Sequence, residues 1–504
     1  MFWNEVVSRR EIFLQNFGKG LNTYEDPTRI DPEELTDCLN VSCDDYPVIR
    51  TRNDRVWNDA DVLTNPRGIG ARGSSYIHVV ADNTWKYKII TSTAWTDITT
   101  TLSTLSNQAS FHEFRTYALT TDASTGDRLT YTIAAYVNSS NNQNGYWTAD
   151  STFEFFSTSY TEPSSGSIYT NYPPQSNLMT VHKYRVYGFD HDLRTLRFSE
   201  LGNPLWYKAE NYLDITEMRG IAKAITAFAD HIIVWGENSM HELYGESNFN
   251  FELINVSNTI GCVGKYAHTE CEGRLYWMDN LGLFMYTGGL PRPVGLKAKG
   301  YFDQVLTTDK YKISLGNFES KLYITLPIYN STQEYKTVVI DVKDIANGYE
   351  LVTVEDECYI KNYVNIRDKL YALHNDGRVW NMNSTLRTGY DNSTAISWSF
   401  EGKPLTDDGF DLNSCVRDVW VQYLRTDTNS SLNLKYSTHS HSTAFSTFMA
   451  STDFIYSTDL RRTRFFTSST ELQLINFLKW QFSGEGYCKI YGIQSKIVSF
   501  GNQV

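Results

Sequence analysis

Residues 274–286 read RLYWMDNLGLFMY, two short apolar runs on either side of a polar turn that ends in glycine. Runs of this length, rich in aromatic and aliphatic residues and bounded by turn residues, are typical of β-strands. Gly282 can adopt the positive φ angle that a tight hairpin needs. The stretch therefore predicts a β-hairpin, and its order of residue types returns along the chain.

The recurring pattern is a basic residue, an aliphatic residue and a tyrosine, then more apolar residues, a polar turn and a second apolar run. It also occurs at Arg185-Val186-Tyr187, Lys321-Leu322-Tyr323 and Lys369-Leu370-Tyr371, and more loosely at residues 76, 117 and 233. The third positions, at residues 76, 117, 187, 233, 276, 323 and 371, are spaced by 41, 70, 46, 43, 47 and 48 residues. A repeat of this period built from short strands is typical of a β-propeller, with one small sheet per repeat. We therefore expect an all-β fold in which residues 36–389 form a propeller of about seven blades.

The one long step predicts an insertion in a blade. Near residues 138–175 the composition shifts to Ser, Thr, Asn, Gly and Tyr, with few aliphatic residues. We interpret this region as an inserted loop or hairpin that projects from the propeller. Inserted loops on a rigid scaffold often contain the residues that bind a partner. A solvated loop without a binding role has the same composition and is the alternative.

Residues 1–35 do not follow the repeat. Residues 8–17 are compatible with a helical turn or two, and Asp31 to Leu35 begin like a short helix, with Asp as N-cap and Pro at the first helical position. The segment also carries Phe2, Trp3, Phe13 and Phe17, which is unusual for a disordered leader. We expect an N-terminal arm that docks on a neighbouring subunit.

After about residue 390 the repeat stops, and strands alternate with longer Ser- and Thr-rich connections. By the period of two, Val419, Val421 and Tyr423 fall on one strand face. Another strand face is expected to carry Leu474, Asn476, Leu478, Trp480 and Phe482. We expect residues 390–504 to form a separate antiparallel β-sandwich. A closing blade of the propeller is the alternative, which the change in period makes less consistent with the sequence.

Composition and charge limit the classes of function. The 504 residues carry a formal net charge of −13, so a high affinity for the phosphate backbone of nucleic acids is not expected. Seven cysteines are odd in number and scattered, which argues against a disulfide framework and for synthesis in a reducing compartment such as a host cytoplasm. No signal peptide and no membrane-spanning stretch are expected.

Several short motifs partly match known cofactor or metal sites, but none of them predicts a catalytic, cofactor or metal site. Gly68 to Gly73 match G-x-G-x-x-G, but a strand instead of a helix is expected to follow, so a flexible loop is the simpler interpretation. Asp190-His191-Asp192 and His439-Ser440-His441 lack a second cluster at zinc-like spacing, as do Cys38 and Cys43. A polar turn is the simpler interpretation of the acidic triplet.

Glycan-cleaving propellers were also considered. Their repeated Ser-x-Asp-x-Gly-x-x-Trp motif is absent, and Asp82-Asn83-Thr84-Trp85 is the nearest partial match. Glycoside hydrolysis needs two facing carboxylates, and the sequence does not nominate a pair among its 58 acidic residues. Arg461, Arg462 and Arg464 are as compatible with a surface patch as with a site for an acidic sugar.

Three passages together resemble a known family, the β-propeller tail hub or nozzle proteins of short-tailed bacteriophages, also called DNA-stabilisation proteins. The first passage is Gly20-Leu21-Asn22, followed by Asp31 to Leu35, Asn40 and Arg50-Thr51-Arg52. The second, Ser199 to Trp206, is similar to a turn of the form S-x-x-G-x-P-x-x-W with one residue fewer before the tryptophan. The third comprises residues 225–244 and 261–289, which resemble paired blades of that family.

The resemblance implies a non-enzymatic structural protein of the virion tail. It implies a ring, usually of six copies, below the portal and adaptor, which extends the DNA channel, helps to retain packaged DNA and carries tail fibres or spikes. Genomic DNA would then pass through the lumen without sequence-specific binding, in keeping with the negative net charge. The alternatives are a receptor-binding tail protein that grips host glycan through the propeller and residues 138–175, and a glycan-cleaving enzyme.

Overall fold

The computed structural model describes the chain except for residues 1–7, 58, 100–101, 103–107, 117–129, 136–143, 149–152, 248, 331, 357, 406–413, 439–443, 467–471, 476 and 501–504. Strands dominate the described part. The helical elements there are η1 (Leu296–Ala298), α1 (Lys299–Phe302), η2 (Thr307–Lys312), η3 (Ile345–Asn347) and η4 (Ser451–Asp453). The expected all-β class is therefore confirmed.

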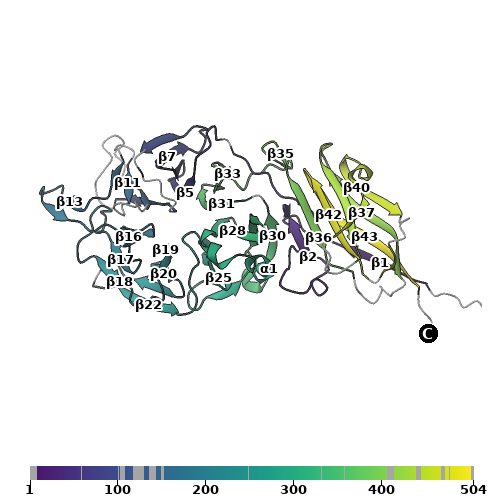
Figure 1. Ribbon diagram of the computed structural model, residues 1–504, viewed down its shortest axis with the longest axis horizontal. Coiled ribbons are helices and arrows are strands. Elements are labelled where there is room, and N and C mark those ends of the chain that lie inside the picture. The colour runs from purple at the N-terminus through teal and green to yellow at the C-terminus, as the bar shows by residue number, and fades with distance from the viewer. Residues whose placement is uncertain are drawn as a thin grey trace, which may run out of the picture.

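Between residues 66 and 381, six four-stranded antiparallel sheets and a three-stranded one follow each other in chain order within the described part (Figure 1). We call them the repeat sheets. Their strands are β5 (Pro66–Arg72), β6 (Tyr76–Ala81), β7 (Thr84–Ile89) and β8 (Thr96–Thr99); β9 (Ser110–Arg115), β10 (Thr130–Ala135), β11 (Gly145–Trp147) and β12 (Glu154–Phe155); β15 (Met179–His182), β16 (Arg185–Phe189), β17 (Thr195–Phe198) and β18 (Tyr212–Asp214); β19 (Ala222–Phe228), β20 (His231–Gly236), β21 (Met240–Tyr244) and β22 (Glu252–Ser257); β23 (His268–Cys271), β24 (Arg274–Asp279), β25 (Gly282–Tyr286) and β26 (Arg292–Val294); β27 (Ser314–Phe318), β28 (Lys321–Asn330), β29 (Thr332–Asp341) and β30 (Leu351–Glu355); β31 (Ile360–Ile366), β32 (Lys369–His374) and β33 (Val379–Asn381).

The repeat sheets are arranged side by side in a β-propeller-like manner. The first strands of most neighbouring sheets contact each other, and β31 of the last sheet contacts β5 of the first. Neighbouring sheets share buried aromatic side chains, such as Trp235 and Trp277, whose ring centroids lie 5.5 Å apart. The predicted hairpin of residues 274–286 is confirmed, because Leu275 to Asp279 pair in register with Tyr286 to Gly282.

The segment before β5 contacts both the last repeat sheet and the first. Val56 forms an isolated antiparallel bridge with Asn381 of β33. The buried carboxylate of Asp59 accepts a hydrogen bond from the backbone N–H of Val379 (2.7 Å) and forms an ion pair with Lys88 of β7. Both side chains of this ion pair are excluded from solvent, so Val56 and Asp59 connect β33 to β7.

Two glycines in β5 let its neighbour approach closely. A Cβ atom at Gly68 would lie 1.8 Å from the carbonyl oxygen of Ala109, and one at Gly70 would lie 2.2 Å from the Cβ of Phe111 in β9. The motif Gly68 to Gly73 is therefore mostly a strand, and the expected flexible loop is wrong. Glycine is required here because the first strands of adjacent sheets converge.

Part of the expected insertion lies outside the described residues, namely 138–143 and 149–152. The described part is not one excursion. β11 and β12 complete the second repeat sheet, and only β13 (Ser159–Thr161) and β14 (Ile168–Thr170) form a separate hairpin. This hairpin lies at the far end of the molecule from the C-terminal domain (Figure 1).

The C-terminal domain consists of two antiparallel sheets. One contains β3 (Val41–Ser42), β4 (Ile49–Thr51), β43 (Cys488–Phe500), β37 (Ser414–Arg425) and β40 (Ser457–Phe466), with β1 (Ser8–Gln15) beside β43 and β41 (Gln473–Ile475) beside β37. The other contains β2 (Leu35–Leu39), β36 (Ser397–Gly402), β42 (Lys479–Glu485), β38 (Ser431–Ser437) and β39 (Ser446–Met449). A short hairpin of β34 (Tyr390–Asp391) and β35 (Thr394–Ala395) precedes β36.

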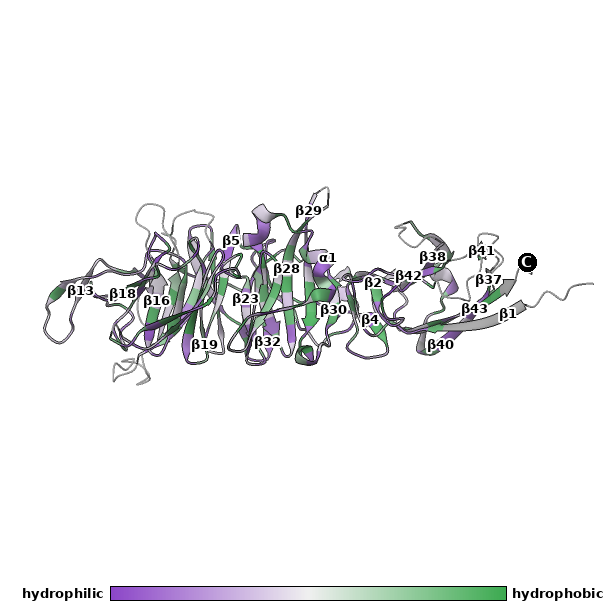
Figure 2. Ribbon diagram, turned by 90° about the horizontal axis from the view of Figure 1, so that it is seen from below, coloured by the Kyte–Doolittle hydropathy of each residue, from purple (hydrophilic) through white to green (hydrophobic). Residues whose placement is uncertain are grey.

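The two sheets share one core. Val419, Val421 and Tyr423 are fully buried, which confirms the first predicted strand face, and so are Leu478, Trp480 and Phe482 of the second. Leu474 lies instead in β41 of the other sheet, and Asn476 lies outside the described residues. Trp480 of one sheet donates its indole N–H to the hydroxyl of Ser495 in the other (3.1 Å). Figure 2 shows this domain beside the repeat sheets in a view from below.

The start of the chain differs from the expectation. Residues 8–15 form the strand β1, paired with β43, and not a helical turn; residues 31–34 form a turn that leads into β2. Phe17 packs on Phe400 and Phe482 at ring distances of 5.1 and 5.8 Å. The C-terminal domain thus takes strands from both chain ends, unlike the expected boundaries at 35/36 and 389/390. Docking of the arm on a neighbouring subunit stays a prediction.

Candidate functional site

The acidic triplet at residues 190–192 forms a turn between β16 and β17. Asp192 accepts hydrogen bonds from the backbone N–H groups of Arg194 and Thr195, each at 3.0 Å. Asp190 accepts a hydrogen bond from Nε of Arg197 (2.9 Å). The carboxylates are thus engaged in local turn contacts, and the interpretation as a polar turn is confirmed.

The cysteine and histidine candidates give no metal site within the described residues. Cys38 and Cys43 are both buried, and burial raises the pKa of the Cys43 thiol to about 12. No group of three potential metal ligands occurs in the described part of the chain. His439 and His441 lie outside it.

The arginine candidates of the C-terminal domain lie on the edge strand β40. Arg464 forms an ion pair with Asp418 of β37 (3.0 Å), and Arg462 donates a hydrogen bond to Gln494 of β43 (2.7 Å). Arg461, Arg462 and Arg464 are exposed, so they form part of a solvated sheet face. Asp82 to Trp85 form the turn from β6 into β7, and Trp85 is fully buried.

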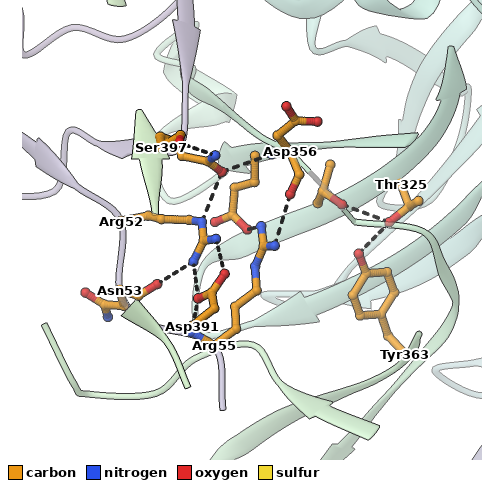
Figure 3. A network of polar contacts seen from close by, with 11 residues as sticks. Arg52, Asn53, Arg55, Thr325, Asp356, Tyr363, Asp391 and Ser397 are labelled. Carbon is orange, nitrogen blue, oxygen red and sulfur yellow. Dashed lines mark hydrogen bonds and ion pairs between the residues drawn. The ribbon is translucent and has the colours of Figure 1, made fainter. Parts of the chain in front are cut away.

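A cluster of buried charged side chains lies at the junction between the repeat sheets and the C-terminal domain (Figure 3). At its centre Arg52, which is 4% exposed, forms two parallel hydrogen bonds to the carboxylate of Asp391, at 2.9 and 2.5 Å. Nε of Arg52 donates to the side-chain oxygen of Asn40 (3.1 Å). Asn40 in turn donates to the carbonyl of Ser397 in β36 (2.8 Å). The two parallel hydrogen bonds from Arg52 to Asp391 are of the strong, charge-assisted kind.

Arg55 extends the network to the repeat sheets. Its guanidinium forms an ion pair with Glu355 of β30 (2.7 Å), donates to the carbonyl of Asp356 (3.0 Å) and lies over the ring of Trp380 in β33. The backbone N–H of Arg55 donates to Asp391 (2.7 Å). Asp391 is therefore shared by two arginines, one facing each part of the molecule.

The ionisation of Asp391 follows from these contacts. Burial alone would raise the pKa of this carboxyl group, but the hydrogen bond from Arg52 and the charges of Arg55 and Arg52 lower it below its ordinary value. The carboxylate therefore stays charged at neutral pH. Breaking the pair would leave a buried charge without its partner, so this junction resists separation of the two parts.

A cavity of about 730 Å³ lies beside this junction, between β28–β30, β32–β33 and the segment from β3 to Trp57. Most of the charges on its wall are paired. Arg50 contacts Asp44 (3.4 Å) and Asp45 (3.2 Å), and Lys321 contacts Asp44 (2.6 Å). The wall of the cavity therefore carries mainly ion pairs of both signs.

Sequence reasoning noted Arg50-Thr51-Arg52 only through the family resemblance and did not identify the junction. The signal in the sequence is the density of charge, three arginines in six residues from Arg50 to Arg55. The main partners of Arg52 and Arg55 are Asp391, Glu355 and Asp356, which follow 300 residues or more later. Pairings so distant are not visible in a single sequence.

Comparison with known proteins adds little. No protein-family model and no curated protein matches the chain. Solved structures that resemble it include the extracellular domain of a putative one-component system from B. thetaiotaomicron (10% identity, 67% of this chain, TM-score 0.35); this chain spans 40% of its length. Others are a chain of a Mitotic Checkpoint Complex (8% identity, 71% of this chain and 95% of that one, TM-score 0.36) and an exo-β-1,3-galactanase from Phanerochaete chrysosporium (8% identity, 87% and 98%, TM-score 0.28).

Likenesses this distant carry no argument about function. Among the described residues, no helix is long and apolar enough to span a membrane. In the described part of the chain, the contacts of Arg52 and Arg55 with Asp391 and Glu355 join the C-terminal domain to the repeat sheets.

Proposed function

We propose that this protein is a structural component of a bacteriophage tail, a hub or nozzle whose copies assemble into a ring below the portal and adaptor. The ring extends the DNA channel, helps to retain packaged DNA and anchors fibres or spikes. The observation that carries the proposal is the position of the residues that resemble this family. Those of the first passage lie where the N-terminal segment contacts the repeat sheets, whereas Ser199 to Trp206 and residues 225–289 lie within the repeat sheets and their connections.

Gly20-Leu21-Asn22 supplies one side of this contact. The backbone N–H of Leu21 donates to the carbonyl of Val352 in β30 (2.8 Å), and a Cβ atom at Gly20 would lie 2.6 Å from the same carbonyl. The side chain of Asn22 donates to the buried Glu34 (2.9 Å), which pairs with Lys297 of η1 (2.8 Å). The acidic segment Asp31 to Leu35 is thus bonded, through Glu34, to the chain between β26 and β27. Arg52, which belongs to the same resembling passage, is bonded to Asn40 and to Asp391.

The finer architecture belongs to the same proposal. We take the seven repeat sheets as seven blades of one propeller, with Val56 adding a fourth strand to the last blade through its bridge to Asn381. A propeller fastened to a second β-domain by buried ion pairs is a stiff body. Stiffness suits a subunit that must keep its place in a ring while DNA moves past it.

Net charge supports a passive conduit. A chain with a formal net charge of −13 gains no affinity by releasing counterions from DNA. DNA would therefore pass through the lumen without sequence-specific binding. The other partners in this proposal are the adaptor protein, a fibre or spike protein and further copies of the chain.

Mass photometry and negative-stain images of the purified protein, alone and mixed with the adaptor of the same phage, test the proposal. A closed ring with a central hole is expected in at least one of the two samples. A protein that stays monomeric in both would overturn the hub function.

A point variant tests the arm. Leu14 on β1 is 65% exposed, so Leu14→Asp should disturb docking on a neighbouring subunit while leaving the fold intact. The matched control is Leu290→Asp, because Leu290 is 76% exposed on the turn between β25 and β26. Loss of rings in the first variant alone is the expected result; equal behaviour of the two variants would contradict a role of the arm in assembly.

A further inference from the structure

A second cavity lies at the end of the molecule opposite the C-terminal domain. Its volume is about 480 Å³, within the range of about 300–1,000 Å³ typical of ligand pockets. It is bounded by the outer strands of the second repeat sheet, by the hairpin β13–β14 and by the connection from β17 to β18. Figure 1 shows this hairpin beyond the edge of the repeat sheets.

Aromatic rings held in place by their neighbours form the walls. Tyr160 of β13 stacks on Trp206 with ring centroids 4.8 Å apart and an angle of 12° between the planes. Trp206 lies behind Tyr160 and is not itself a lining residue, and neither is Lys208, which lies over the ring of Trp206, 4.6 Å from its centroid. Asn203 donates a hydrogen bond to the hydroxyl of Tyr160 (2.8 Å), which fixes the position of this ring in the cavity wall.

The opposite wall comes from the second repeat sheet. Tyr131 of β10 and Tyr146 of β11 contact each other edge to face, with centroids 5.7 Å apart, and Tyr146 packs on the buried Phe156 at 5.5 Å. The sheet pairing holds Ile133 opposite Tyr146, so the two tyrosines come from adjacent strands of one rigid sheet. Rings from two separate elements therefore face one cavity.

The polar side chains among the described lining residues are hydroxyls, the amides of Asn171 and Asn203, and one carboxylate. Tyr146 donates its hydroxyl to Glu154 of β12, and burial, this hydrogen bond and the charge of Glu154 raise the pKa of Tyr146. The hydroxyl of Tyr131 makes no hydrogen bond to any described residue. Burial first, and then the neighbouring Tyr160 and Glu154, raise the pKa of Tyr131, so its phenol stays protonated and able to donate.

We propose that this cavity binds a neutral saccharide. Aromatic rings offer an apolar surface for the C–H faces of a sugar ring, while tyrosine hydroxyls and a carboxylate offer donors and acceptors for its hydroxyl groups. No lysine or arginine is among the described residues that line the cavity, so an anionic sugar or a phosphate would meet Glu154 without a compensating cation.

The same wall argues for binding and against cleavage. Glycoside hydrolysis uses two carboxyl groups that flank the bond. Glu154 is the single carboxylate among the described lining residues. The proposed site holds a saccharide and leaves it intact. This inference is independent of the ring assembly proposed above, because the cavity is built within one chain from β10–β14 and the residues between β17 and β18.

A glycan array tests the proposal with the full-length protein. The array carries neutral oligosaccharides of glucose, galactose, mannose, N-acetylglucosamine and rhamnose, together with sialylated, glucuronylated and phosphorylated oligosaccharides. The neutral group alone is expected to retain the protein. Saturation-transfer difference NMR with the best neutral oligosaccharide then measures binding in solution.

Three variants assign the binding to the cavity. Tyr160→Ala removes the stacked ring and should weaken binding about tenfold or more, a loss of about 1.4 kcal/mol. Tyr131→Phe and Glu154→Gln change only the polar contacts and should weaken it by smaller factors. Tyr349→Ala, at a tyrosine that is 73% exposed near η3, is the matched control and should bind like the natural protein.

The outcomes are decisive. Retention of neutral glycans that falls in the cavity variants, at unchanged thermal stability, supports the site. Retention of anionic glycans alone, of no glycan, or of neutral glycans to the same extent by all variants overturns it. Because the assay needs no assembly, a failure here leaves the hub function standing, and a failure of ring formation leaves this site standing.

Discussion

Each repeat sheet consists of strands that follow one another along the chain, whereas the sheets of the C-terminal domain combine strands from residues 8–51 with strands from residues 397–500. In the fifth repeat sheet, β24 pairs with β25 across a turn of two residues. In the C-terminal domain, β1 pairs with β43, which lies at the other end of the chain. The two regions contain the same kind of antiparallel ladder and differ in the distance between partners.

This difference has consequences for folding and for rigidity. A hairpin closes a short loop, so its strands can pair without the rest of the chain, while the pairing of β1 with β43 needs both termini in place. The C-terminal domain also receives its strands through the segment that carries Arg50, Arg52 and Arg55. The arginine junction is therefore part of the path that joins the two regions.

The largest effect is expected from separating the C-terminal domain from the chain start. A fragment of residues 390–504 lacks β1, β2, β3 and β4 and should fail to form a stable fold, since two sheets would lose edge strands and the core would lose Phe17. Circular dichroism and NMR amide dispersion measure this. Cooperative unfolding of the fragment would contradict the comparison.

A fusion provides the control for this experiment. Asp54 accepts hydrogen bonds from the backbone N–H groups of Thr388 and Gly389, each at 2.9 Å, so the two segments lie side by side. Residues 8–56 joined to residues 386–504 by a short flexible linker should therefore restore a folded domain without the repeat sheets.

The second effect concerns the junction. Arg52→Ala leaves the carboxylate of Asp391 buried without its forked partner and should lower the free energy of unfolding by about 3–5 kcal/mol. Denaturant unfolding measures the loss. Arg387→Ala is the control, because Arg387 is 45% exposed and 3.7 Å from Asp45, and it should change stability by less than about 0.5 kcal/mol. Equal losses in the two variants would show that the junction holds no special place.

The third effect is the pH dependence of the free energy of unfolding of the repeat sheets. His78 of β6 is fully buried, and burial, with a smaller effect from Arg72, lowers its pKa to about 3. The unfolded chain, with an ordinary histidine pKa near about 6.5, binds more protons between these values. The free energy of unfolding of the repeat sheets should therefore fall as the pH falls from about 6.5 to about 3, by up to about 1.4 kcal/mol per pH unit for this residue.

Urea unfolding at pH 7, 6, 5 and 4 measures this slope, and His78→Gln should reduce it by up to about 1.4 kcal/mol per pH unit. The part due to His112 and His268 should remain, since burial also lowers their pKa values, to about 3 and about 4. The indole N–H of Trp85 donates to His78 (3.2 Å), and the amide oxygen of glutamine can replace this acceptor without taking up a proton. An unchanged slope in the variant would assign the acid sensitivity to other groups.

The smallest effect concerns the contact between the first two repeat sheets. Gly68→Ala places a methyl group against the carbonyl of Ala109, a backbone atom that cannot rotate away, and should cost about 1–3 kcal/mol. Ala71→Ser, in the half-buried part of the same strand, should change stability by less than about 0.5 kcal/mol. Thermal unfolding compares the two, and similar stability of both variants would show that β5 and β9 can move apart.

The candidate sites differ in how far the sequence predicted them. The turn at Asp190 to Asp192 was predicted, because its carboxylates bond to residues that follow within seven positions. The junction was not, because Arg52 and Asp391 are 339 positions apart. The cavity near Tyr160 was foreseen only as a projecting insertion, since its walls come from β10–β14 and from residues around Asn203.

The repeat and the all-β class could be predicted from the sequence alone. Hydrophobic spacing and turn residues act within a few positions, so the hairpin at 274–286 and the buried faces of β37 and β42 could be predicted from them. Only the tertiary structure decided that the chain start belongs to the C-terminal domain, that Gly68 and Gly70 lie in a strand, and that Arg52 pairs with Asp391. Each of these features is stabilised by contacts between segments that lie far apart in the sequence. Local patterns of residue types do not show which distant segments pack together.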